Sequence, residues 1–499
     1  MIPISLFEPH TSSINAVEQA ISELTVEKRA FIDDQLVDTR QTLERKYSPV
    51  DGRSLSGIAA CDAADVHTAV LAARRSFADG VWRRMDRSAA LNRLADKMQA
   101  NRGELALLDC LETGRALQNY YFDSIPKAID ALKWFANNYE RLRDIPIAAP
   151  LNVEAQIVHE PVGVVGLITP WNDPLVPAMW KLGASLMMGN SVVIKPSENS
   201  SLSLIQVALL AQQAGIPPGV LNVVPGIGAI TGAALAKHPD VDVIGFTGSS
   251  ETARKILQYA GQSNLKRVEA ECGGKSAMIV TRNCGKLKEA AACIARNMFY
   301  NQGQICSAPS RLIVERSVHE KLMPFVIDAA ARFQPGHAFD IHSAVGSLVS
   351  QSQRARVQRF LDFGNSSAKR LTHFPDPANP LAVAPTIFDD VDPCSELAQE
   401  EIFGPVLSVI VADNLQHAIL LANATRFGLA AGIWTDCQRE ATTAAAELLA
   451  GIVHINSWGE DTMEAPFGGV KASGFGKDKS MLAFESYSYR KTLWKNVTP

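Results

Sequence analysis

The sequence lacks the features that mark several classes of protein. Its eight cysteines include no pair at CxxC spacing, which indicates neither a zinc site nor a disulfide framework, so we expect reduced thiols and no metal. A net charge of −4 offers no basic surface for nucleic acid or an anionic membrane. No run is long and apolar enough to span a bilayer, and the N-terminal segment has no signal-peptide pattern. These absences predict a cytoplasmic protein with no nucleic acid or membrane as partner.

The composition is that of a globular protein with more than one hydrophobic core. Hydrophobic residues make up 47% of the chain and charged residues 20%, which is neither a disordered nor a membrane-like composition. A chain of 499 residues is too long for a single small core. We therefore expect two or three domains.

The order of the apolar runs predicts an α/β fold. Residues 60–145 carry apolar side chains at helical spacing, and from residue 162 short β-rich runs alternate with helical runs as far as residue 273. The β-rich runs are apolar throughout, as expected for strands of a parallel sheet covered on both faces. A second block with the same alternation covers residues 274–475.

Two further segments belong to neither block. Residues 144–163 predict a hairpin, and residues 487–496 alternate like an edge strand. An edge strand needs a partner for its backbone hydrogen bonds. We therefore expect the tail to pair with another strand, which a second subunit could supply.

Polar residues at the end of one strand suggest a ribose-binding site. Ligands of open parallel sheets bind at the carboxyl ends of the strands. In the run VVIKPSE, Lys195 ends a strand and Glu198 follows three residues later. A carboxylate there can accept hydrogen bonds from ribose hydroxyls and would repel a 2′-phosphate, which favours NAD over NADP. The alternative is a solvated pair with no ligand.

The next two strand ends carry glycines. Gly226, Gly228 and Gly232 lie between a strand and a helix at a spacing one residue longer than GxGxxG, which alone is a weak signal. Gly248 and Ser249 end the following strand, and their N–H groups open a helix where a pyrophosphate could bind. Glycines often end strands, but three successive strand ends with suitable chemistry predict a dinucleotide site.

Cys306 lies in the polar segment NQGQICSAPS, between apolar runs. A structural cysteine normally packs among apolar side chains, so this setting predicts an exposed, reactive sulfur rather than a buried, inert one. A cysteine nucleophile acts as the thiolate, and no histidine lies in a protease-like signature. Glu271, which ends a strand in EAECGGKS, is the other candidate base; a solvated strand-end acid is the alternative.

Seven short motifs follow one another along the chain: PWN (170–172), IKPSE (194–198), FTGS (246–249), ECGGKS (271–276), NQGQIC (301–306), EEIFGPV (400–406) and PFGG (466–469). Through these motifs the chain resembles the aldehyde dehydrogenase superfamily along nearly its whole length, in its NAD-dependent, non-acylating form. The resemblance implies a Rossmann-like parallel-sheet NAD-binding domain (residues 1–140 and 162–273) and an α/β catalytic domain (274–475). It also implies a small β oligomerisation arm (141–161 and 476–499) in a homodimer or homotetramer.

The resemblance also implies roles for single residues. Cys306 would attack the aldehyde carbon, the Asn172 side chain and the Cys306 N–H would bind the oxyanion, and Glu271 would activate the water that releases the acid. Glu401 would bind the nicotinamide ribose, with Phe403 beside the ring. The full set of implied NAD-binding residues is Thr169, Trp171, Lys195, Glu198, Gly228, Gly232, Phe246, Gly248, Ser249, Glu401 and Phe403.

The substrate side departs from the family pattern. Asp173 stands where the residue after Asn172 is generally aromatic, and Cys272 replaces an apolar residue, which is a mild change. The C-terminal segment resembles the branch that oxidises gamma-glutamylaminobutyraldehyde and other amino aldehydes. Acids around the tunnel entrance would attract such a cationic substrate, unless they form a solvated rim. The expected substrate residues are Asp173, Trp180, Trp458 and Asp461, and the entrance acids are Asp173, Glu460, Asp461 and Glu464.

Two alternative functions fit the same scaffold. A coenzyme A-acylating semialdehyde dehydrogenase would transfer the acyl group to CoA, and such enzymes typically lack the glutamate found here at position 271. A non-catalytic binding protein would be free to lose its nucleophile, whereas this chain keeps Cys306, Glu271 and Asn172.

Overall fold

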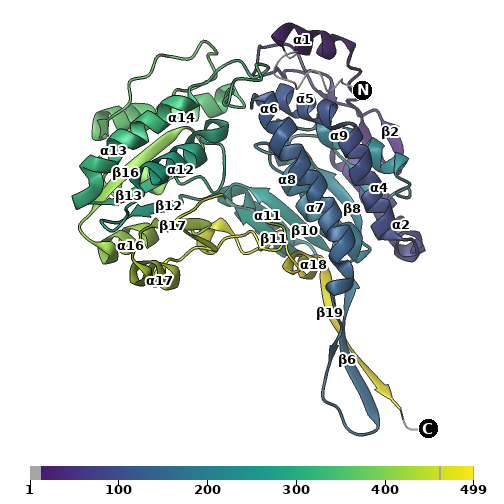
Figure 1. The fold of residues 1–499 in the computed structure, drawn as a ribbon. Helices are drawn as coiled ribbons and strands as arrows, with labels where there is room; N and C mark the ends of the chain where they lie inside the picture. The colour runs from purple at the N-terminus through teal and green to yellow at the C-terminus, as the bar shows by residue number, and fades with distance from the viewer. Residues whose placement is uncertain (1–12, 460–461, 498–499) are drawn as a thin grey trace.

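The structure, a computed structural model, describes residues 13–459 and 462–497 and contains two seven-stranded sheets (Figure 1). The first sheet has five parallel strands, extended at one edge by two antiparallel strands from the N-terminal region. The predicted α/β fold with parallel sheets is confirmed. In spatial order the strands are β11 (Arg267–Cys272), β10 (Val243–Gly248), β7 (Val164–Ile168), β8 (Ser191–Lys195), β9 (Leu221–Val223), β1 (Ala30–Ile32) and β2 (Gln35–Val37).

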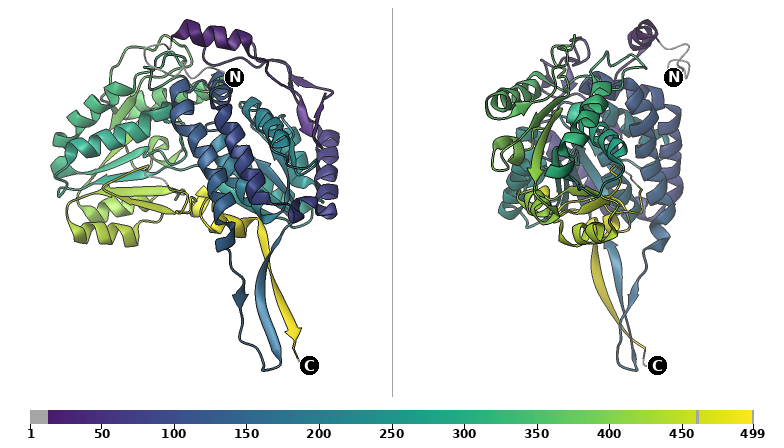
Figure 2. Two further views of the ribbon diagram at one scale, coloured as in Figure 1. Left: turned by 45° about the vertical axis from the view of Figure 1, so that its right-hand side comes forward. Right: turned by 60° about the vertical axis from the view of Figure 1, so that its left-hand side comes forward.

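Helices cover both faces of this sheet, because successive side chains of a strand point to opposite faces. Val165 and Leu167 of β7 join one hydrophobic core, whereas Val164 and Ile168 join another. The first core is built with α4 (Arg87–Ala100), α5 (Arg102–Thr113), α7 (Ile125–Asn138), α8 (Leu175–Met188) and α9 (Leu202–Gln213), and the second with α2 (Ala63–Asp79), α10 (Ala233–Lys237) and α11 (Ser250–Gln262) (Figure 2).

The second sheet is also mostly parallel and covered on both faces. Helices α12 (Leu287–Phe299) and α13 (Arg316–Ala330) pack on one face, and α14 (Gln351–Ser367), α16 (Leu415–Asn423) and α17 (Gln438–Glu447) pack on the other. Only β14 runs antiparallel to its neighbour. The strand order is β14 (Lys369–Arg370), β15 (Thr386–Asp389), β16 (Val406–Ala412), β13 (Arg311–Glu315), β12 (Ala277–Val280), β17 (Ala430–Trp434) and β18 (Ile452–Ile455).

A third, three-stranded sheet projects away from the two large ones (Figures 1 and 2). The predicted hairpin is present as β5 (Ile145–Pro146) and β6 (Val153–Pro161). The C-terminal strand β19 (Ser488–Asn496) pairs antiparallel with β6 along its whole length. The tail therefore finds its partner within the same chain and forms an edge of this projecting sheet.

Shorter elements connect the larger ones. Across the described residues, no helix has both the length and the apolar character needed to cross a membrane. The remaining α-helices and strands of the described residues are α1 (Ile14–Glu23), β3 (Thr42–Leu43), β4 (Ile58–Ala59), α3 (Val81–Arg84), α6 (Leu117–Asn119), α15 (Glu396–Gln399) and α18 (Leu482–Ser486).

Candidate active site

Asn172 and the segment that leads to Cys306 are hydrogen-bonded to each other. Asn172 follows β7, and its Nδ2 atom donates to the Gln304 carbonyl oxygen at 2.9 Å. In return, Asn301 Nδ2 donates to the Asn172 carbonyl oxygen at 3.1 Å. A side-chain amide has two N–H donors, so the bond to Gln304, two residues before Cys306 in the sequence, leaves Asn172 a second donor.

A turn with unusual backbone angles shapes this segment. Asn301, Gln302 and Gly303 have consecutive positive φ angles of 51°, 56° and 67°. A Cβ added to Gly303 would lie 2.4 Å from the Gly404 carbonyl oxygen, so this position cannot carry a side chain. Backbone strain of this kind persists only where the surrounding contacts hold it, often at functional sites. The turn packs the Cys306 segment against residues 401–404.

Cys306 is partly exposed, but protein surrounds its sulfur. Burial, and then the nearby carboxyl groups of Glu401 and Glu271, raise the pKa of this thiol from 9.0 to about 12. The backbone N–H groups of Ser307 and Cys306 act in the opposite direction and lower the pKa. The raised pKa favours the protonated thiol over the thiolate in the protein without cofactor.

Glu271 lies near the end of β11 and is 3% exposed. Burial, and then the carboxyl group of Asp478, raise the pKa of Glu271 well above its usual value. Among the described residues, neither oxygen of Glu271 has a hydrogen-bond partner. A Cβ added to Gly468, in the PFGG motif, would lie 2.5 Å from Glu271 Oε1. The Glu271 carboxyl group contributes to the raised pKa of the Cys306 thiol, but no hydrogen bond joins the two groups.

Glu401 lies against the two glycines of the ECGGKS segment. The Gly274 N–H donates to Glu401 Oε1 at 3.1 Å, and a Cβ added to Gly273 would lie 2.0 Å from Glu401 Oε2. Burial raises the pKa of Glu401 to about 7, although the Gly274 N–H opposes the change. The Trp171 and Phe403 rings meet edge to face, with centroids 5.3 Å apart.

The first group of predicted cofactor residues converges at the ends of β7 and β8. Lys195 Nζ lies 3.2 Å from Glu198 Oε2, and this ammonium lowers the pKa of Glu198 although burial acts to raise it. A Cβ added to Gly228 would lie 3.9 Å from Glu198 Oε2, and one added to Gly232 would lie 3.8 Å from Lys195 Cδ. Thr169 Oγ1 is buried without a hydrogen-bond partner in the described chain. An ionised carboxylate can accept hydrogen bonds from the two hydroxyls of a ribose, and the neighbouring Gly228 has no side chain to obstruct the sugar.

The second group lies where β10 leads into α11. Ser249 precedes the helix, and its Oγ accepts a hydrogen bond from the Thr252 N–H at 3.2 Å. A Cβ added to Gly248 would lie 2.5 Å from the Phe246 ring, so the glycine lets the ring pack closely. The N-terminus of a 13-residue helix attracts an anion. Together with the Glu198 region, this helix end fits NAD, with the phosphates at α11.

The predicted substrate residues do not all meet. Trp180 of α8 lies beside Phe467, with ring centroids 5.3 Å apart. Trp458 is 7% exposed and packs in the core of the second sheet with α12. Asp461 lies outside the described residues, as does Glu460. Trp180 and Trp458 thus lie in different parts of the fold, and their substrate roles stay predictions.

Two of the predicted entrance acids are paired with arginines. Asp173 Oδ2 accepts hydrogen bonds from Arg115 Nη1 and Ser124 Oγ, each at 2.9 Å. Glu464 accepts a hydrogen bond from Arg141 at 2.8 Å. The positive charges of Arg115 and Arg141 balance these two carboxylates, and the attraction of a cationic substrate by the entrance acids stays a prediction.

Sequence reasoning missed two groups beside the site. One is the buried ion pair between Lys181 and Asp478, which lies next to Glu271. The other is Arg115, which contacts both Asp173 and Tyr300. No local motif signals either group, because the partners are far apart in the sequence.

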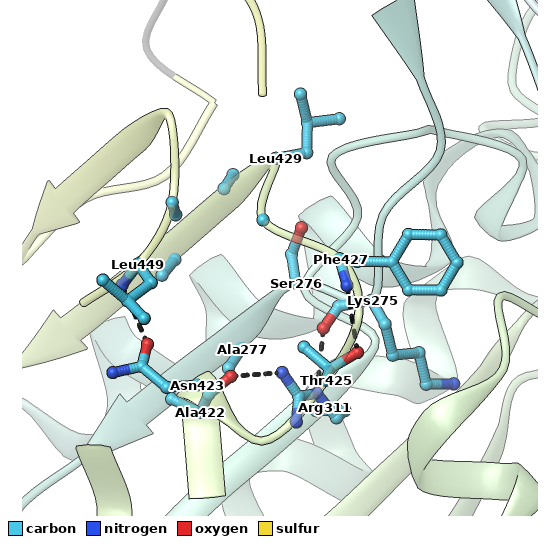
Figure 3. A pocket seen from close by; sticks show the side chains of 14 residues that line it. Lys275, Ser276, Ala277, Arg311, Ala422, Asn423, Thr425, Phe427, Leu429 and Leu449 are labelled. Atoms are coloured by element: carbon cyan, nitrogen blue, oxygen red, sulfur yellow. Dashed lines mark hydrogen bonds between the residues drawn. The ribbon is translucent and has the colours of Figure 1, made fainter. Parts of the chain in front are cut away.

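A small pocket lies behind the ECGGKS segment (Figure 3). Arg311 donates hydrogen bonds to the carbonyl oxygens of Lys275, Leu421 and Ala422 at 2.7–2.9 Å, which fixes the end of the segment. Burial lowers the pKa of Lys275 to about 7. Within residues 13–459 and 462–497, no cluster of three or more His, Cys, Asp or Glu side chains could hold a metal ion.

Comparisons with known proteins agree with this geometry. Curated relatives include the NADP/NAD-dependent aldehyde dehydrogenase PuuC of Escherichia coli, 42% identical over 96% of this chain and 97% of its own. The aminoacetaldehyde dehydrogenase of Pseudomonas aeruginosa is 41% identical over 94% of this chain and 96% of its own. The solved structure of a mutant indole-3-acetaldehyde dehydrogenase AldA of P. syringae with NAD+ is 43% identical, with a TM-score of 0.95 over 97% of this chain and 99% of that one.

The sequence profile of the aldehyde dehydrogenase family matches residues 36–493, which is nearly the whole chain. Members of this family oxidise aldehydes to carboxylic acids; of the relatives above, PuuC is named as NADP/NAD-dependent and the AldA structure contains NAD+. The chain therefore belongs to the aldehyde dehydrogenase family and is an NAD-dependent oxidoreductase.

Proposed function

We propose that this aldehyde dehydrogenase oxidises its substrate while the substrate is covalently bound to Cys306. One observation carries the proposal: the Asn172 side chain is hydrogen-bonded to the segment that ends at Cys306, and Glu271 and Glu401 lie near the sulfur. These observations support a single site that combines a nucleophile, an amide donor and a carboxyl group.

The reaction begins with the Cys306 sulfur. Its thiolate attacks the aldehyde carbon and forms a C–S bond, while Asn172 Nδ2 and the Cys306 N–H stabilise the oxyanion. Removal of one such donor typically lowers the rate about a hundred- to a thousandfold. Loss of a hydride from the adduct leaves a thioester, and water then releases the acid and restores the thiol.

Glu271 serves as the base in this proposal. The pKa of the Cys306 thiol, raised by burial to about 12, means that a neighbouring group must take its proton before attack. Glu271 has no other hydrogen-bond partner among the described residues, so its oxygens are available to hold that proton and, later, one from water. The buried pair of Lys181 and Asp478 also acts on Glu271: the Asp478 carboxyl group raises the pKa of Glu271, and the Lys181 ammonium lowers it.

The chain's own residues would hold NAD in three places. Lys195 and Glu198 would bind the adenosine ribose, and the α11 N-terminus with Gly248 and Ser249 would bind the pyrophosphate. Glu401 would bind the nicotinamide ribose. Bound NAD would supply the acceptor for the hydride that leaves the substrate carbon. The remaining proposed cofactor contacts are Thr169, Trp171, Gly228, Gly232, Phe246 and Phe403.

We further propose three functional regions and an oligomer in the cytoplasm. Residues 1–140 and 162–273 form the NAD-binding domain, residues 274–475 the catalytic domain, and residues 141–161 and 476–499 the oligomerisation arm. The exposed side chains of Leu493 and Trp494 on β19 support the arm's role. Sedimentation velocity should give a dimer or tetramer, and truncation after residue 487 should reduce it to smaller species; a monomeric full-length chain would exclude the arm's role.

The proposed substrate is an amino aldehyde. The support is the similarity of this chain to the aminoacetaldehyde dehydrogenase named above. The entrance acids add little to this support, because Arg115 and Arg141 balance two of them. The proposed substrate contacts are Asp173, Trp180, Trp458 and Asp461. Kinetics with propanal and 3-aminopropanal decide the matter. We expect a higher kcat/KM for 3-aminopropanal, and equal values would contradict this substrate class.

NADH formation tests the reaction type. We expect NADH from an aldehyde panel with NAD and water alone, with no stimulation by CoA. Strict dependence on CoA would identify the acylating alternative instead. The Cys306→Ala variant should produce no NADH, whereas unchanged production would exclude Cys306 as the nucleophile. The Cys394→Ala variant, which alters an exposed cysteine, is the matched control.

A further inference from the structure

Arg115 joins the two chain segments that carry the proposed oxyanion donors. It follows α5 and its side chain is 1% exposed. Arg115 Nη1 donates to Asp173 Oδ2 at 2.9 Å, and Asp173 is the residue next to Asn172. Arg115 Nη2 donates to the Tyr300 hydroxyl oxygen at 2.6 Å, and Tyr300 immediately precedes the strained turn that leads to Cys306. One planar guanidinium therefore contacts both segments.

The surroundings fix the orientation of this guanidinium. The rings of Tyr120 and Tyr300 each lie with their centroid 4.9 Å from Arg115 Cζ. Ser124 Oγ donates to the same oxygen of Asp173 at 2.9 Å, and the Tyr300 hydroxyl donates to Asp123 Oδ2 at 3.2 Å. Each end of the bridge is thus held by a second hydrogen bond.

We propose that Arg115 is a positioning residue that sets the distance between Asn172 and Cys306 by binding Asp173 on one side and Tyr300 on the other. The inference rests on the proposed function, because the two donors it aligns are those of the proposed oxyanion site. The geometry also explains why an acid stands at position 173: the arginine needs an acceptor beside Asn172, and Asp173 supplies it.

The size of the expected effect follows from the geometry. A misplacement of about 1 Å in a catalytic group can lower the rate about a hundredfold. Loss of Arg115 would release both segments and would leave the largely buried Asp173 carboxylate without its cation. The defect should appear in kcat, because the NAD-binding residues at the ends of β8 and β10 do not contact Arg115.

The test compares Arg115→Met with wild type, using 3-aminopropanal and propanal with NAD. We expect kcat to fall about a hundredfold while the KM for NAD stays within about twofold. In the Asn172→Ala background, Arg115→Met should lower kcat by less than about tenfold, because one of the aligned donors is already gone. A fall in kcat of the same size in both backgrounds would overturn the proposal.

A milder variant keeps the test valid if Arg115→Met does not fold. Tyr300→Phe removes only the hydroxyl that links Arg115 to the Cys306 segment, and we expect it to lower kcat about tenfold at unchanged KM for NAD. Arg74→Met is the matched control, since Arg74 bonds Asp240 and Asp242 on the other side of the first sheet and should leave kcat unchanged.

The possible outcomes separate this inference from the proposed function. If wild type forms no NADH from any aldehyde, the proposed function fails. If wild type is active and both Arg115→Met and Tyr300→Phe retain its kcat, the proposed function stands and the positioning role of Arg115 is wrong.

Discussion

The reactivity of Cys306 without nucleotide offers a quantitative prediction. A pKa raised from 9.0 to about 12 by burial leaves about a thousandfold less thiolate at pH 8 than an ordinary cysteine has. A thiolate of higher pKa is more nucleophilic, which recovers a factor of about 20 to 30. We therefore expect iodoacetamide to alkylate Cys306 about 40-fold more slowly than a cysteine in a short peptide.

Peptide mapping by mass spectrometry measures this rate residue by residue. Cys394 is exposed and serves as the internal control in the same sample. The Cys306 rate should rise about tenfold per pH unit from pH 7 to pH 10, because this range lies below the raised pKa. A fast reaction that levels off near pH 8 would refute the burial argument and would show a thiolate already present in the free protein.

Three further predictions test the cofactor site and the base. Glu198→Gln removes the carboxylate that would repel a 2′-phosphate, so kcat/KM for NADP should rise at least tenfold relative to NAD; an unchanged ratio would exclude this role. Because burial raises the pKa of Glu271, its base form grows as pH rises, so wild-type kcat should increase with pH, and the increase should be absent in Glu271→Gln. Lys46 forms a buried ion pair with Glu112 and donates to the Glu198 carbonyl oxygen at 2.9 Å. Lys46→Met should raise the KM for NAD and, by leaving the Glu112 carboxylate buried and unpaired, lower the free energy of unfolding by about 3–5 kcal/mol; an unchanged KM and melting temperature would contradict this.

The strands of the first sheet could be predicted because their chemistry is local. β7, β8 and β10 are continuous apolar runs followed by polar or glycine residues, and this pattern needs no knowledge of distant segments. β1 and β2, of three residues each, are too short to produce a periodic signal, and they are defined by the pairing of β1 with β9 and of β2 with β1. The partner of the C-terminal tail could not be predicted, because an edge strand carries no mark of which strand it will meet.

The residues of the candidate site also divide into those that a local motif predicts and those that depend on distant segments. Cys306, Asn172 and Glu271 each stand in a short sequence motif, and each motif can be recognised without knowledge of distant segments. The charge at the substrate side depends instead on Arg115, which lies 58 positions from Asp173 in the sequence. The sequence reveals four acids near the entrance but not the arginines that balance two of them. Burial of the Cys306 sulfur is likewise a property of the packed fold rather than of its polar segment.

The central claim is a covalent intermediate at Cys306 that Glu271 helps to hydrolyse. The most direct measurement is intact and peptide mass spectrometry of the Glu271→Gln variant after mixing with NAD and aldehyde. One equivalent of NADH per subunit should form without further turnover, more slowly than the first turnover of wild type because the glutamine of this variant cannot accept the Cys306 proton, and an acyl adduct should accumulate on the peptide that contains Cys306. Steady turnover without an adduct, or an adduct on another cysteine, would contradict the central claim.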